Sequence, residues 1–269
     1  MKFHDTHTHS HFSPDARMTM EQSVRQAVQC GLAGIAITDH LDLEPPAGKQ
    51  GCFRFDPAQQ QREIDRLAAL YPGLEIYKGV EAGLQPHALA ATREFLAPYT
   101  FDCVIASQHF VDGVDPYYGA YYENKTCAQA YGRALEVMYA TALEFRDFDV
   151  LGHFDYIARY APYPDRDLTY RAFADRLDPL LRFLAEEGKA LEINTNTYRT
   201  RNGYTPGLDT CILRRFRELG GEAVTLGSDA HDPFRLRENF EQYARIIREC
   251  GFRYLAHYRN RRPVFTPIG

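Results

Sequence analysis

Histidine and acidic residues stand at the ends of several separate apolar segments in this sequence. His7 and His9 in FHDTHTHS are two residues apart, as are Asp229 and His231 in GSDAH. Side chains two residues apart on an extended strand project to the same face, so each pair can reach one metal ion. The segments GIAITD, IYKGV, CVIASQ and VLG are followed in the same way by His40, Glu81, His109 and His153. Such imidazoles and carboxylates suit Zn, Mn or Fe, and the pattern indicates a metalloenzyme.

The length and composition of the chain favour one soluble domain. Its 269 residues are 45% hydrophobic and 13% aromatic, which is typical of a globular protein with a substantial core. No apolar run approaches the roughly 20 residues that cross a membrane. The start MKFHDTHTHS carries no secretion signal. We therefore expect a single domain over residues 1–269, no membrane contact and a cytoplasmic location.

The cysteines and the charges indicate no disulfide framework and no nucleic-acid surface. The six cysteines, at 30, 52, 103, 127, 211 and 250, include no C-x-x-C pair, so we expect reduced thiols. The formal net charge is −5, and the basic residues are interspersed with acidic ones except in RNRR at 259–262. Such a short run is typical of a solvated strand edge, whereas nucleic-acid binding needs a broader basic surface. The sequence does not predict an oligomeric state.

Short apolar segments alternate with amphipathic segments along the chain. After a first strand at His7, strands are predicted over 32–38, 74–81, 101–108, 148–153, 190–195 and 222–228. Helices are predicted over 20–31, 57–73, 87–99, 125–145, 169–188, 208–221 and 233–251. Asp56 and Pro57 resemble the N-cap and first turn of the second helix.

This alternation predicts an α/β fold with parallel strands and right-handed crossover helices. Either a closed barrel or an open doubly wound sheet would satisfy it. In a barrel the carboxyl ends of all strands converge on one mouth, whereas an open sheet would hold the predicted ligands too far apart. The ligand positions therefore favour the barrel, with the aromatic segment 111–125 as a functional loop at its mouth.

The ordered combination of ligand motifs predicts metal binding more strongly than any one motif does. A single H-x-H pair is weak, but HTH, DH, a strand-end glutamate, two strand-end histidines and DAH are rarely assembled by chance. Four histidines outside this pattern are expected to be hydrogen-bonded structural residues: His4, His11, His87 and His257.

The motifs DTHTHS, TDH, GVE, SQHF, GHFD and GSDAH match those of the polymerase and histidinol phosphatase (PHP) superfamily. The chain resembles that family over nearly its whole length, and HFVDGVDPYY and NTNTYR resemble its histidinol-phosphate phosphatases. The resemblance implies a distorted (β/α)7 TIM-like barrel with three divalent metal ions. It assigns the first ion to His7, His9, Glu81 and Asp229, the second to Glu81, His109 and His153, and the third to His40 and His231.

One position departs from the family pattern. Members often have a histidine in the first loop, where the segment HFSPDA has Asp15. A carboxylate oxygen can replace an imidazole as a ligand, and it makes a site more suitable for Mn. We therefore expect Asp15 to complete the third site.

The charge of such a centre suits a phosphate monoester. Three divalent ions exceed the charge of Glu81, Asp229 and Asp15 by about three units, which matches a dianionic phosphate. Asp229 is expected to transfer a proton beside the attacking water, and His231 to act mainly as a ligand. Three carboxylates next to ligand positions are expected to orient imidazole rings: Asp5, Asp39 and Asp155.

Two arginines are candidates for binding phosphate. Arg159 in FDYIARY and Arg199 in NTNTYR follow the fifth and sixth predicted strands. A planar guanidinium binds phosphate through two parallel hydrogen bonds. The tyrosines at 117, 118, 121 and 122 either wall a substrate pocket or pack as a lid.

These features predict a metal-dependent phosphomonoesterase with a small phosphorylated substrate. The resemblance favours hydrolysis of L-histidinol phosphate to L-histidinol and phosphate in histidine biosynthesis. The alternatives are a PHP phosphodiesterase or nuclease, a protein-tyrosine phosphatase and a non-catalytic metal-binding module. The acidic net charge disfavours a nuclease, because a polymer is bound through many phosphate contacts.

Overall fold

The protein is represented by a computed structural model that describes residues 2–45 and 53–269. The strands of its main sheet are β1 His4–Thr8, β2 Gly34–Ile37, β3 His40–Leu41, β4 Glu75–Gly83, β5 Cys103–Ser107, β6 Val150–Leu151, β7 Ala190–Asn194 and β8 Val224–Gly227. A separate hairpin consists of β9 Tyr254–Arg259 and β10 Arg262–Pro267.

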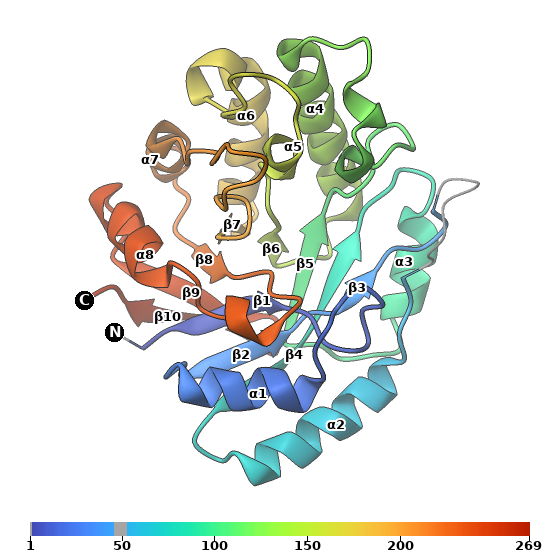
Figure 1. Ribbon diagram of the computed structural model, residues 1–269, viewed down its shortest axis with the longest axis vertical. Coiled ribbons are helices and arrows are strands. Elements are labelled where there is room, and N and C mark those ends of the chain that lie inside the picture. The colour runs from blue at the N-terminus through green and yellow to red at the C-terminus, as the bar shows by residue number, and fades with distance from the viewer. Residues whose placement is uncertain (1, 46–52) are drawn as a thin grey trace.

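Helices lie around the main sheet (Figure 1). They are α1 Met20–Gln29, α2 Pro57–Leu70, α3 Leu89–Leu96, α4 Cys127–Phe145, α5 Tyr156–Arg159, α6 Tyr170–Glu186, α7 Thr210–Glu218 and α8 Phe240–Glu249. Short 3₁₀ turns occur as η1 Pro116–Tyr118, η2 Ala120–Tyr122 and η3 Pro233–Arg235.

The main sheet is parallel and nearly closes on itself. Its strands follow the order β1-β2-β4-β5-β6-β7-β8, with β3 paired to β4. The backbone N of Asp229 donates to His7 O at 2.8 Å, and His9 N donates to Ala230 O at 3.0 Å. These bonds join the end of β1 to the segment after β8, and Thr8 bridges Ala230 in parallel. The predicted distorted (β/α)7 barrel is confirmed.

Side-chain caps fix where several helices begin. In α1, Thr19 accepts a bond from Gln22 N, and the Gln22 side chain accepts one from Thr19 N. The predicted cap of α2 is confirmed, since Asp56 accepts a bond from Ala58 N. Such caps satisfy amide groups that the first helical turn leaves unpaired. The loop between β1 and α1, which carries Asp15, therefore ends at a fixed point.

The apolar core fills the barrel and the space between the barrel and its helices. Strand residues such as Ile35, Val80 and Leu191 are fully buried, and Leu135 of α4 and Leu213 of α7 pack in the same cluster. Burial of this apolar surface is the main force that holds the helices against the sheet. The rigid sheet in turn fixes the positions of the residues at its carboxyl end.

The chain after residue 233 differs from the prediction. The single helix predicted over 233–251 is divided into η3 and α8, because Arg237 and Asn239 each have a left-handed φ of 61°. Residues 254–267 form the unpredicted β9–β10 hairpin. Its turn residues Asn260 and Arg261 have φ values of 50° and 62°, as expected for a type I′ turn. The RNRR run lies at this turn.

Within residues 2–45 and 53–269, no helix is both long and apolar enough to cross a bilayer. Five cysteines are free thiols: Cys30, Cys103, Cys127, Cys211 and Cys250. The sixth, Cys52, lies outside the described residues.

Candidate metal centre

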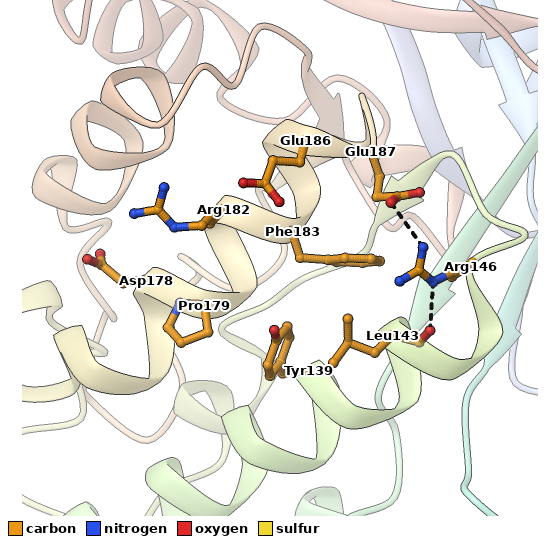
Figure 2. A pocket seen from close by; sticks show the side chains of 9 residues that line it. All are labelled: Tyr139, Leu143, Arg146, Asp178, Pro179, Arg182, Phe183, Glu186 and Glu187. Carbon is orange, nitrogen blue, oxygen red and sulfur yellow. Dashed lines mark hydrogen bonds and ion pairs between the residues drawn. The ribbon is translucent and has the colours of Figure 1, made fainter.

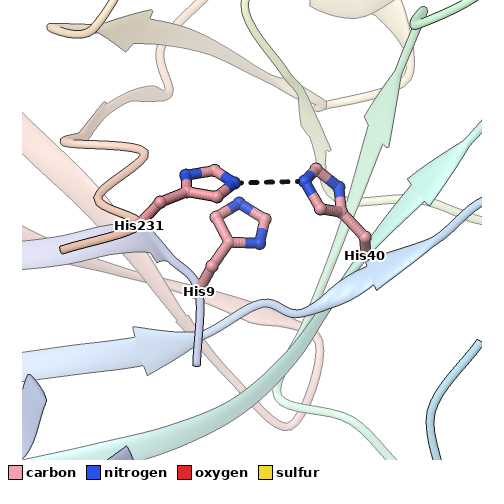
Figure 3. Close-up of side chains that lie close together, drawn as sticks. All are labelled: His9, His40 and His231. Atoms are coloured by element: carbon pink, nitrogen blue, oxygen red, sulfur yellow. Dashed lines mark hydrogen bonds between the residues drawn. The ribbon is translucent and has the colours of Figure 1, made fainter. Parts of the chain in front are cut away.

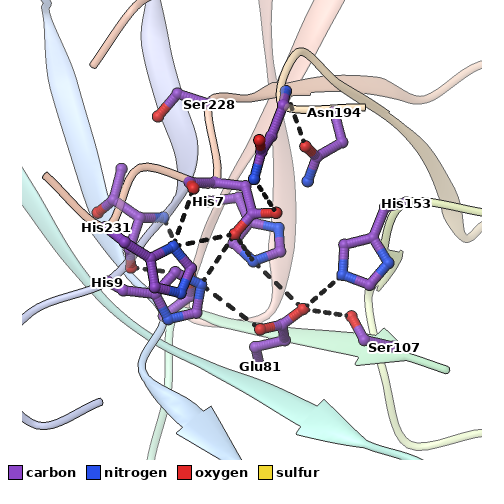
Figure 4. A network of polar contacts seen from close by, with 12 residues as sticks. His7, His9, Glu81, Ser107, His153, Asn194, Ser228 and His231 are labelled. Atoms are coloured by element: carbon purple, nitrogen blue, oxygen red, sulfur yellow. Dashed lines mark hydrogen bonds and ion pairs between the residues drawn. The ribbon is translucent and has the colours of Figure 1, made fainter. Parts of the chain in front are cut away.

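The predicted ligands gather at the carboxyl ends of the parallel strands. They come from β1 and its following loop, from β3 and β4, and from the segments after β5, β6 and β8. In chain order they are His7, His9, Asp15, His40, Glu81, His109, His153, Asp229 and His231. Six regions of the sequence thus contribute to one connected network, part of which is drawn in Figure 4.

Glu81 is fully buried at the centre of this network. Five imidazoles lie within 3.5 Å of its carboxylate oxygens: His7, His9, His40, His109 and His153. Its Oε1 is 2.8 Å from His153 Nε2, and its Oε2 is 2.7 Å from His40 Nδ1. The two oxygens thus face different groups of histidines, as a carboxylate that bridges two cations would.

A second group of residues lies on the outer side of Glu81. Figure 3 shows the rings of His9, His40 and His231 side by side, with Nε2 of His40 3.3 Å from Nε2 of His231. The Asp15 carboxylate faces both nitrogens, at 3.6 Å from His40 and 3.3 Å from His231. Asp15 is 46% exposed, so this group opens to solvent. The structure brings the expected replacement ligand next to the two histidines.

Asp229 connects the histidines to an arginine. Its Oδ1 lies 3.3 Å from His9 Nε2 and 3.8 Å from His7 Nε2. Its Oδ2 accepts hydrogen bonds from Arg159 Nη1 at 2.9 Å and from Asn196 Nδ2 at 3.1 Å. Asp229 has a φ of 51°, a left-handed conformation that a non-glycine residue adopts at a cost. The backbone bonds from Asp229 N to His7 O and from His9 N to Ala230 O fix the chain on both sides of this conformation.

Burial and charge act in opposite directions on these groups. Burial lowers the pKa of His7, but the carboxylates of Glu192 and Glu81 outweigh it and raise that pKa well above its usual value. Burial raises the pKa of Glu81, but the facing imidazoles hold it well below its usual range. Burial also raises the pKa of Asp229, and Arg159 reverses the shift. The carboxylates are therefore ionised, which is the state that binds cations.

Two carboxylates that the sequence reasoning missed hold ligand rings in place. Glu192, in the middle of β7, lies 2.7 Å from His7 Nδ1 and leaves Nε2 facing the centre. A Cβ at Gly227 would lie 2.2 Å from Glu192 Oε1 and 2.6 Å from His7 Cβ, so only glycine permits this approach. Asp42 lies 3.0 Å from His109 Nδ1 in the same way. Such partners fix the ring orientation and tautomer of a ligand histidine.

Three other carboxylates, Asp5, Asp39 and Asp155, were expected to orient ligand rings, but they bind other groups. Asp5 accepts bonds from the backbone N of Ser228 and Arg237. Asp155 accepts a bond from Thr197 Oγ1. Asp39 reaches an imidazole only through Ser13, whose Oγ donates to Asp39 at 2.9 Å and lies 3.1 Å from His9 Nδ1. The expectation was wrong for direct contact because adjacency in sequence does not place side chains on one strand face.

Of the two predicted arginines, Arg159 contacts Asp229 directly, and Arg199 is linked to it through Asn196. Arg159 is buried and donates to both Asp229 and Thr197. Arg199 is held by Glu238 at 2.5 Å and by Asn196 at 2.9 Å. In each guanidinium, Nη2 is buried without a hydrogen-bond partner among the described residues. Both arginines therefore retain a donor that can bind an anion.

Arg201 is a third arginine of this region, and the sequence reasoning did not single it out. It donates to Asn196 O at 2.8 Å, and its guanidinium lies 5.6 Å from the centre of the Tyr160 ring. Asn196 thus accepts from Arg199 and Arg201 while it donates to Asp229. The alternating arginines of the segment YRTR were the available sequence signal.

The tyrosines of the 111–125 loop divide into two kinds. Tyr121 and Tyr122 are buried in the core, where their hydroxyl groups donate to Ala130 O and Ile157 O. Tyr117 and Tyr118 are exposed. The buried pair anchors the loop, and the exposed Tyr117 packs edge-on against Tyr118 and Tyr160.

The donor set fits bound metal ions. Several buried atoms that lie close to other donors have no hydrogen bond of regular geometry in the described part of the chain: His7 Nε2, His9 Nε2, His40 Nδ1 and Glu81 Oε2. Buried polar atoms are rarely left unpaired, because desolvation then costs about 1–3 kcal/mol each. Four overlapping sets of donor atoms here lie within 4.8 Å of one another: His7, His9 and Asp229; His7, Glu81 and His153; His9, His40 and His231; and His40, Asp42 and His109. Divalent cations shared among these sets would satisfy the unpaired atoms.

A surface pocket of about 360 Å³ lies elsewhere, between α4 and α6. Figure 2 shows its lining, in which Phe183 and Tyr139 lie among charged side chains such as Arg146 and Glu187. None of the predicted site residues lines it. The metal centre is therefore distinguished by its donor atoms and not by the size of its cavity.

Comparison with known proteins gives relatives that extend over almost the whole chain. The histidinol-phosphatase of Lactococcus lactis is 32% identical over 263 residues, which cover 96% of this chain and 95% of that protein. The "Probable histidinol-phosphatase" of Clostridium acetobutylicum is 30% identical over 254 residues, which cover 93% and 94%.

A solved structure agrees with these sequence relatives. The histidinol phosphate phosphatase of Lactococcus lactis, in complex with zinc, L-histidinol and phosphate, superimposes with a TM-score of 0.89 at 30% identity. The match covers 98% of this chain and 99% of that one. The PHP domain matches residues 5–196, a range that contains the ligands from His7 to His153. The chain therefore belongs to the PHP domain family.

Proposed function

We propose that this protein hydrolyses L-histidinol phosphate to L-histidinol and phosphate, as a metal-dependent phosphomonoesterase of histidine biosynthesis. The main support is the buried network around Glu81, in which imidazoles and carboxylates from six parts of the chain converge. The Lactococcus lactis relative of known structure was solved with zinc, L-histidinol and phosphate, which are the metal and products of this reaction.

We assign three divalent ions to the network. The first would be held by His7, His9, Glu81 and Asp229, the second by Glu81, His109 and His153, and the third by Asp15, His40 and His231. Within each set, donor contacts between 2.8 and 3.8 Å support the assignment. Zn, Mn and Fe all suit such ligands, and the extra carboxylate of Asp15 favours Mn at the third position.

When bound, divalent ions lower the pKa of water toward neutrality and polarise phosphoryl oxygens. The residues of the chain supply orientation and charge. Glu192 and Asp42 hold His7 and His109 in the tautomer that presents Nε2. The negative charge of Glu81 lies in the middle of the site. It would reduce the repulsion between cations that bind close together.

The contacts of Asp229 favour a role as ligand over a role as proton acceptor. Arg159 and Asn196 both donate to its Oδ2, and its pKa lies well below the usual range because Arg159 outweighs the effect of burial. A carboxylate in this state gives up its negative charge reluctantly. We therefore propose that Asp229 binds metal through Oδ1, while His231 remains a ligand at the open side.

The arginines are proposed to bind the phosphate group. Arg159 would donate from Nη2 while Nη1 stays on Asp229, so substrate phosphate and metal ligand share one guanidinium. Arg199 would donate from its own Nη2 while Glu238 and Asn196 hold its orientation. A guanidinium held by carboxylates loses little entropy when it binds an anion.

The proposed substrate is small, and the net charge of −5 does not favour a nucleic-acid partner. We propose one catalytic unit over residues 1–269 and a cytoplasmic location, where free thiols persist.

The function is tested by steady-state kinetics of the Mn- or Zn-loaded protein. L-histidinol phosphate, p-nitrophenyl phosphate and a phosphodiester would be compared as substrates. We expect kcat/KM for L-histidinol phosphate in the range of natural substrates, roughly 10⁴–10⁸ M⁻¹s⁻¹, and far lower values for the others. Faster cleavage of the phosphodiester would refute the proposal.

A further inference from the structure

A second cluster of histidines and a carboxylate lies at the opposite end of the barrel. His4 begins β1, Glu75 begins β4, and His257 is in β9. Their nitrogen and oxygen donor atoms all lie within 4.8 Å of one another. A strand rises about 3.3 Å per residue, so His4 and His7 lie roughly 10 Å apart along β1. The cluster is therefore separate from the metal centre at the barrel mouth.

The strand register brings His4 and Glu75 together across a glycine. Gly34 of β2 pairs with His4 on one side and with Glu75 on the other. A Cβ at Gly34 would lie 2.7 Å from His4 Cδ2 and 2.9 Å from Tyr77 Cε2. The missing side chain leaves the space in which His4 Nε2 approaches Glu75 Oε2 to 3.2 Å.

The third residue arrives from the C-terminal hairpin, which Figure 1 shows beside the N-terminal start of β1. The ring of His257 stacks on His4 with centroids 3.8 Å apart and an interplanar angle of 12°. His257 is only 6% exposed, and its ring also packs against Tyr77. Its nitrogens make no hydrogen bond to residues 2–45 or 53–269 and are not among the fully buried unpaired atoms, so a ligand can reach them from solvent.

The carboxylate is positioned and accessible. Tyr77 donates from its hydroxyl to Glu75 Oε2 at 2.6 Å, which fixes the carboxylate beside His4. Glu75 is 51% exposed, and Arg259 Nη1 lies 3.9 Å from its Oε1 at the surface. An ion from solvent can thus reach the cluster. Among the described residues, exposed Arg259 is the one cation near Glu75 Oε1.

The protonation states of the three groups suit a cation. Burial lowers the pKa of His4, and burial followed by the neighbouring His4 lowers the pKa of His257 to about 4. The bond from Tyr77 lowers the pKa of Glu75. At neutral pH the cluster therefore holds neutral imidazoles and an ionised carboxylate, the forms that bind metal.

We propose that His4, Glu75 and His257 form a further metal site for a divalent cation of borderline softness, with Zn²⁺ as the best fit. Two imidazoles and one carboxylate leave the remaining coordination to water, a donor set that Zn²⁺ accepts. Because an imidazole binds metal in the plane of its ring, one of the two stacked rings would turn out of the stack to bind the same ion. The ion would connect β1 and β4 of the barrel to β9, which belongs to a separate sheet. Its effect would therefore be structural, because it would stabilise the packing of the β9–β10 hairpin against the amino end of the barrel.

The site is tested by counting zinc in the whole protein. Unchanged protein and the variants His257→Gln and Glu75→Gln would be saturated with Zn²⁺, freed of unbound metal and measured by elemental analysis. We expect each variant to bind about one Zn²⁺ fewer per chain and to keep its phosphatase activity. We also expect added Zn²⁺ to raise the Tm of the variants less. Equal zinc content and equal Tm shifts in all three proteins would overturn the proposal.

A matched control removes a neighbour that is not a ligand. Arg259→Gln takes away the charge nearest to Glu75 but leaves all three donors, so its zinc content should equal that of the unchanged protein. A loss of zinc in this variant as in the others would mean that any change at the hairpin disturbs metal binding, which contradicts the assignment.

A measurement on the unchanged protein avoids dependence on how the variants fold. Crystals grown with Zn²⁺ would be measured at the zinc absorption edge. An anomalous peak between His4, Glu75 and His257, with distances near 2.0–2.2 Å, would support the site. No peak there while the barrel mouth is occupied would overturn it.

Discussion

The two ends of the barrel each hold histidines and carboxylates, but they hold them in different surroundings. At the carboxyl end, Glu81 is fully buried and faces five imidazoles, with further carboxylates behind the rings. At the amino end, Glu75 is half exposed, and two imidazoles, His4 and His257, lie beside it. At the carboxyl end, neighbouring carboxylates orient the donor side chains. At the amino end, the carboxylate is open to solvent.

This difference suggests why one end suits catalysis and the other suits structure. A reactive centre needs donors held in fixed orientations and shielded from bulk water, because electrostatic effects are then larger. Glu192 and Asp42 provide that orientation for His7 and His109. Among the described residues, the Tyr77 hydroxyl on Glu75 is the partner that orients a donor of the amino-end cluster, and no carboxylate other than Glu75 is bonded to its histidine rings. Substitutions at the two ends should therefore have effects of different kind and size.

The largest effect is expected from Glu81→Gln. The change removes the charge that the proposed ions share, so metal content at the mouth should fall and kcat/KM should drop by roughly 10³-fold or more, since metal polarisation contributes several kcal/mol. Kinetics and metal analysis on the same sample check this. The matched change at the other end, Glu75→Gln, should leave kcat/KM unaltered. Similar losses of activity in both variants would remove the distinction between the two ends.

The next effect is expected from Glu192→Gln. The amide can still reach His7 Nδ1 but carries no charge, so the ring becomes a weaker ligand. Partners of ligand histidines typically change metal affinity or activity by about 10–100-fold. Metal titration followed by activity would measure the shift. Glu187→Gln serves as control, because Glu187 only pairs with Arg146 at the surface. Unchanged metal affinity in Glu192→Gln would contradict the proposed orienting role.

A smaller effect is expected from Arg199→Ala. The proposed loss of one phosphate contact should raise KM for L-histidinol phosphate by roughly tenfold, with a smaller change in kcat. Arg235 provides a close control, since it also binds Glu238 but is more exposed. Arg235→Ala should leave KM unchanged. If both variants gave the same KM, Arg199 would be only a surface ion pair.

The smallest effect on activity is expected from His257→Gln. The amino-end cluster is separate from the mouth, and distant sites act nearly independently, so kcat/KM should stay within about twofold. Thermal unfolding in the presence of Zn²⁺ should nevertheless show a lower Tm than in the unchanged protein. A large loss of activity with unchanged Tm would indicate that this end communicates with the catalytic centre.

The sequence predicted that the proposed ligands gather at the carboxyl end because most of them lie in the last part of a strand or shortly after it. Parallel strands in a barrel must bring these positions together, so local pattern and topology lead to the same site. Glu192 was missed because it lies within a strand and resembles an ordinary strand residue. Its contact with His7 depends on Gly227, which belongs to the neighbouring β8. Contacts of this kind depend on register, which the pattern of one strand does not reveal.

The amino end was missed for the same reason and for one more. His4, Gly34 and Glu75 form a row only because β1, β2 and β4 pair in this register. His257 arrives on a hairpin that was not predicted, although the RNRR run was expected to lie at a solvated strand edge. His4 and His257 were expected to be hydrogen-bonded structural residues. That prediction holds for His4, which lies 3.2 Å from Glu75, but His257 has no hydrogen bond to the described residues.

The most direct test of the account is a metal titration of metal-free protein with L-histidinol phosphate as substrate. We predict no turnover without metal, and activity that rises as the ions proposed for the Glu81 network are bound, in unchanged protein and in His257→Gln alike. Full turnover of the metal-free protein would contradict the assignment of the carboxyl end as a metal-dependent phosphatase centre. So would metal binding that leaves the protein inactive toward every phosphate monoester.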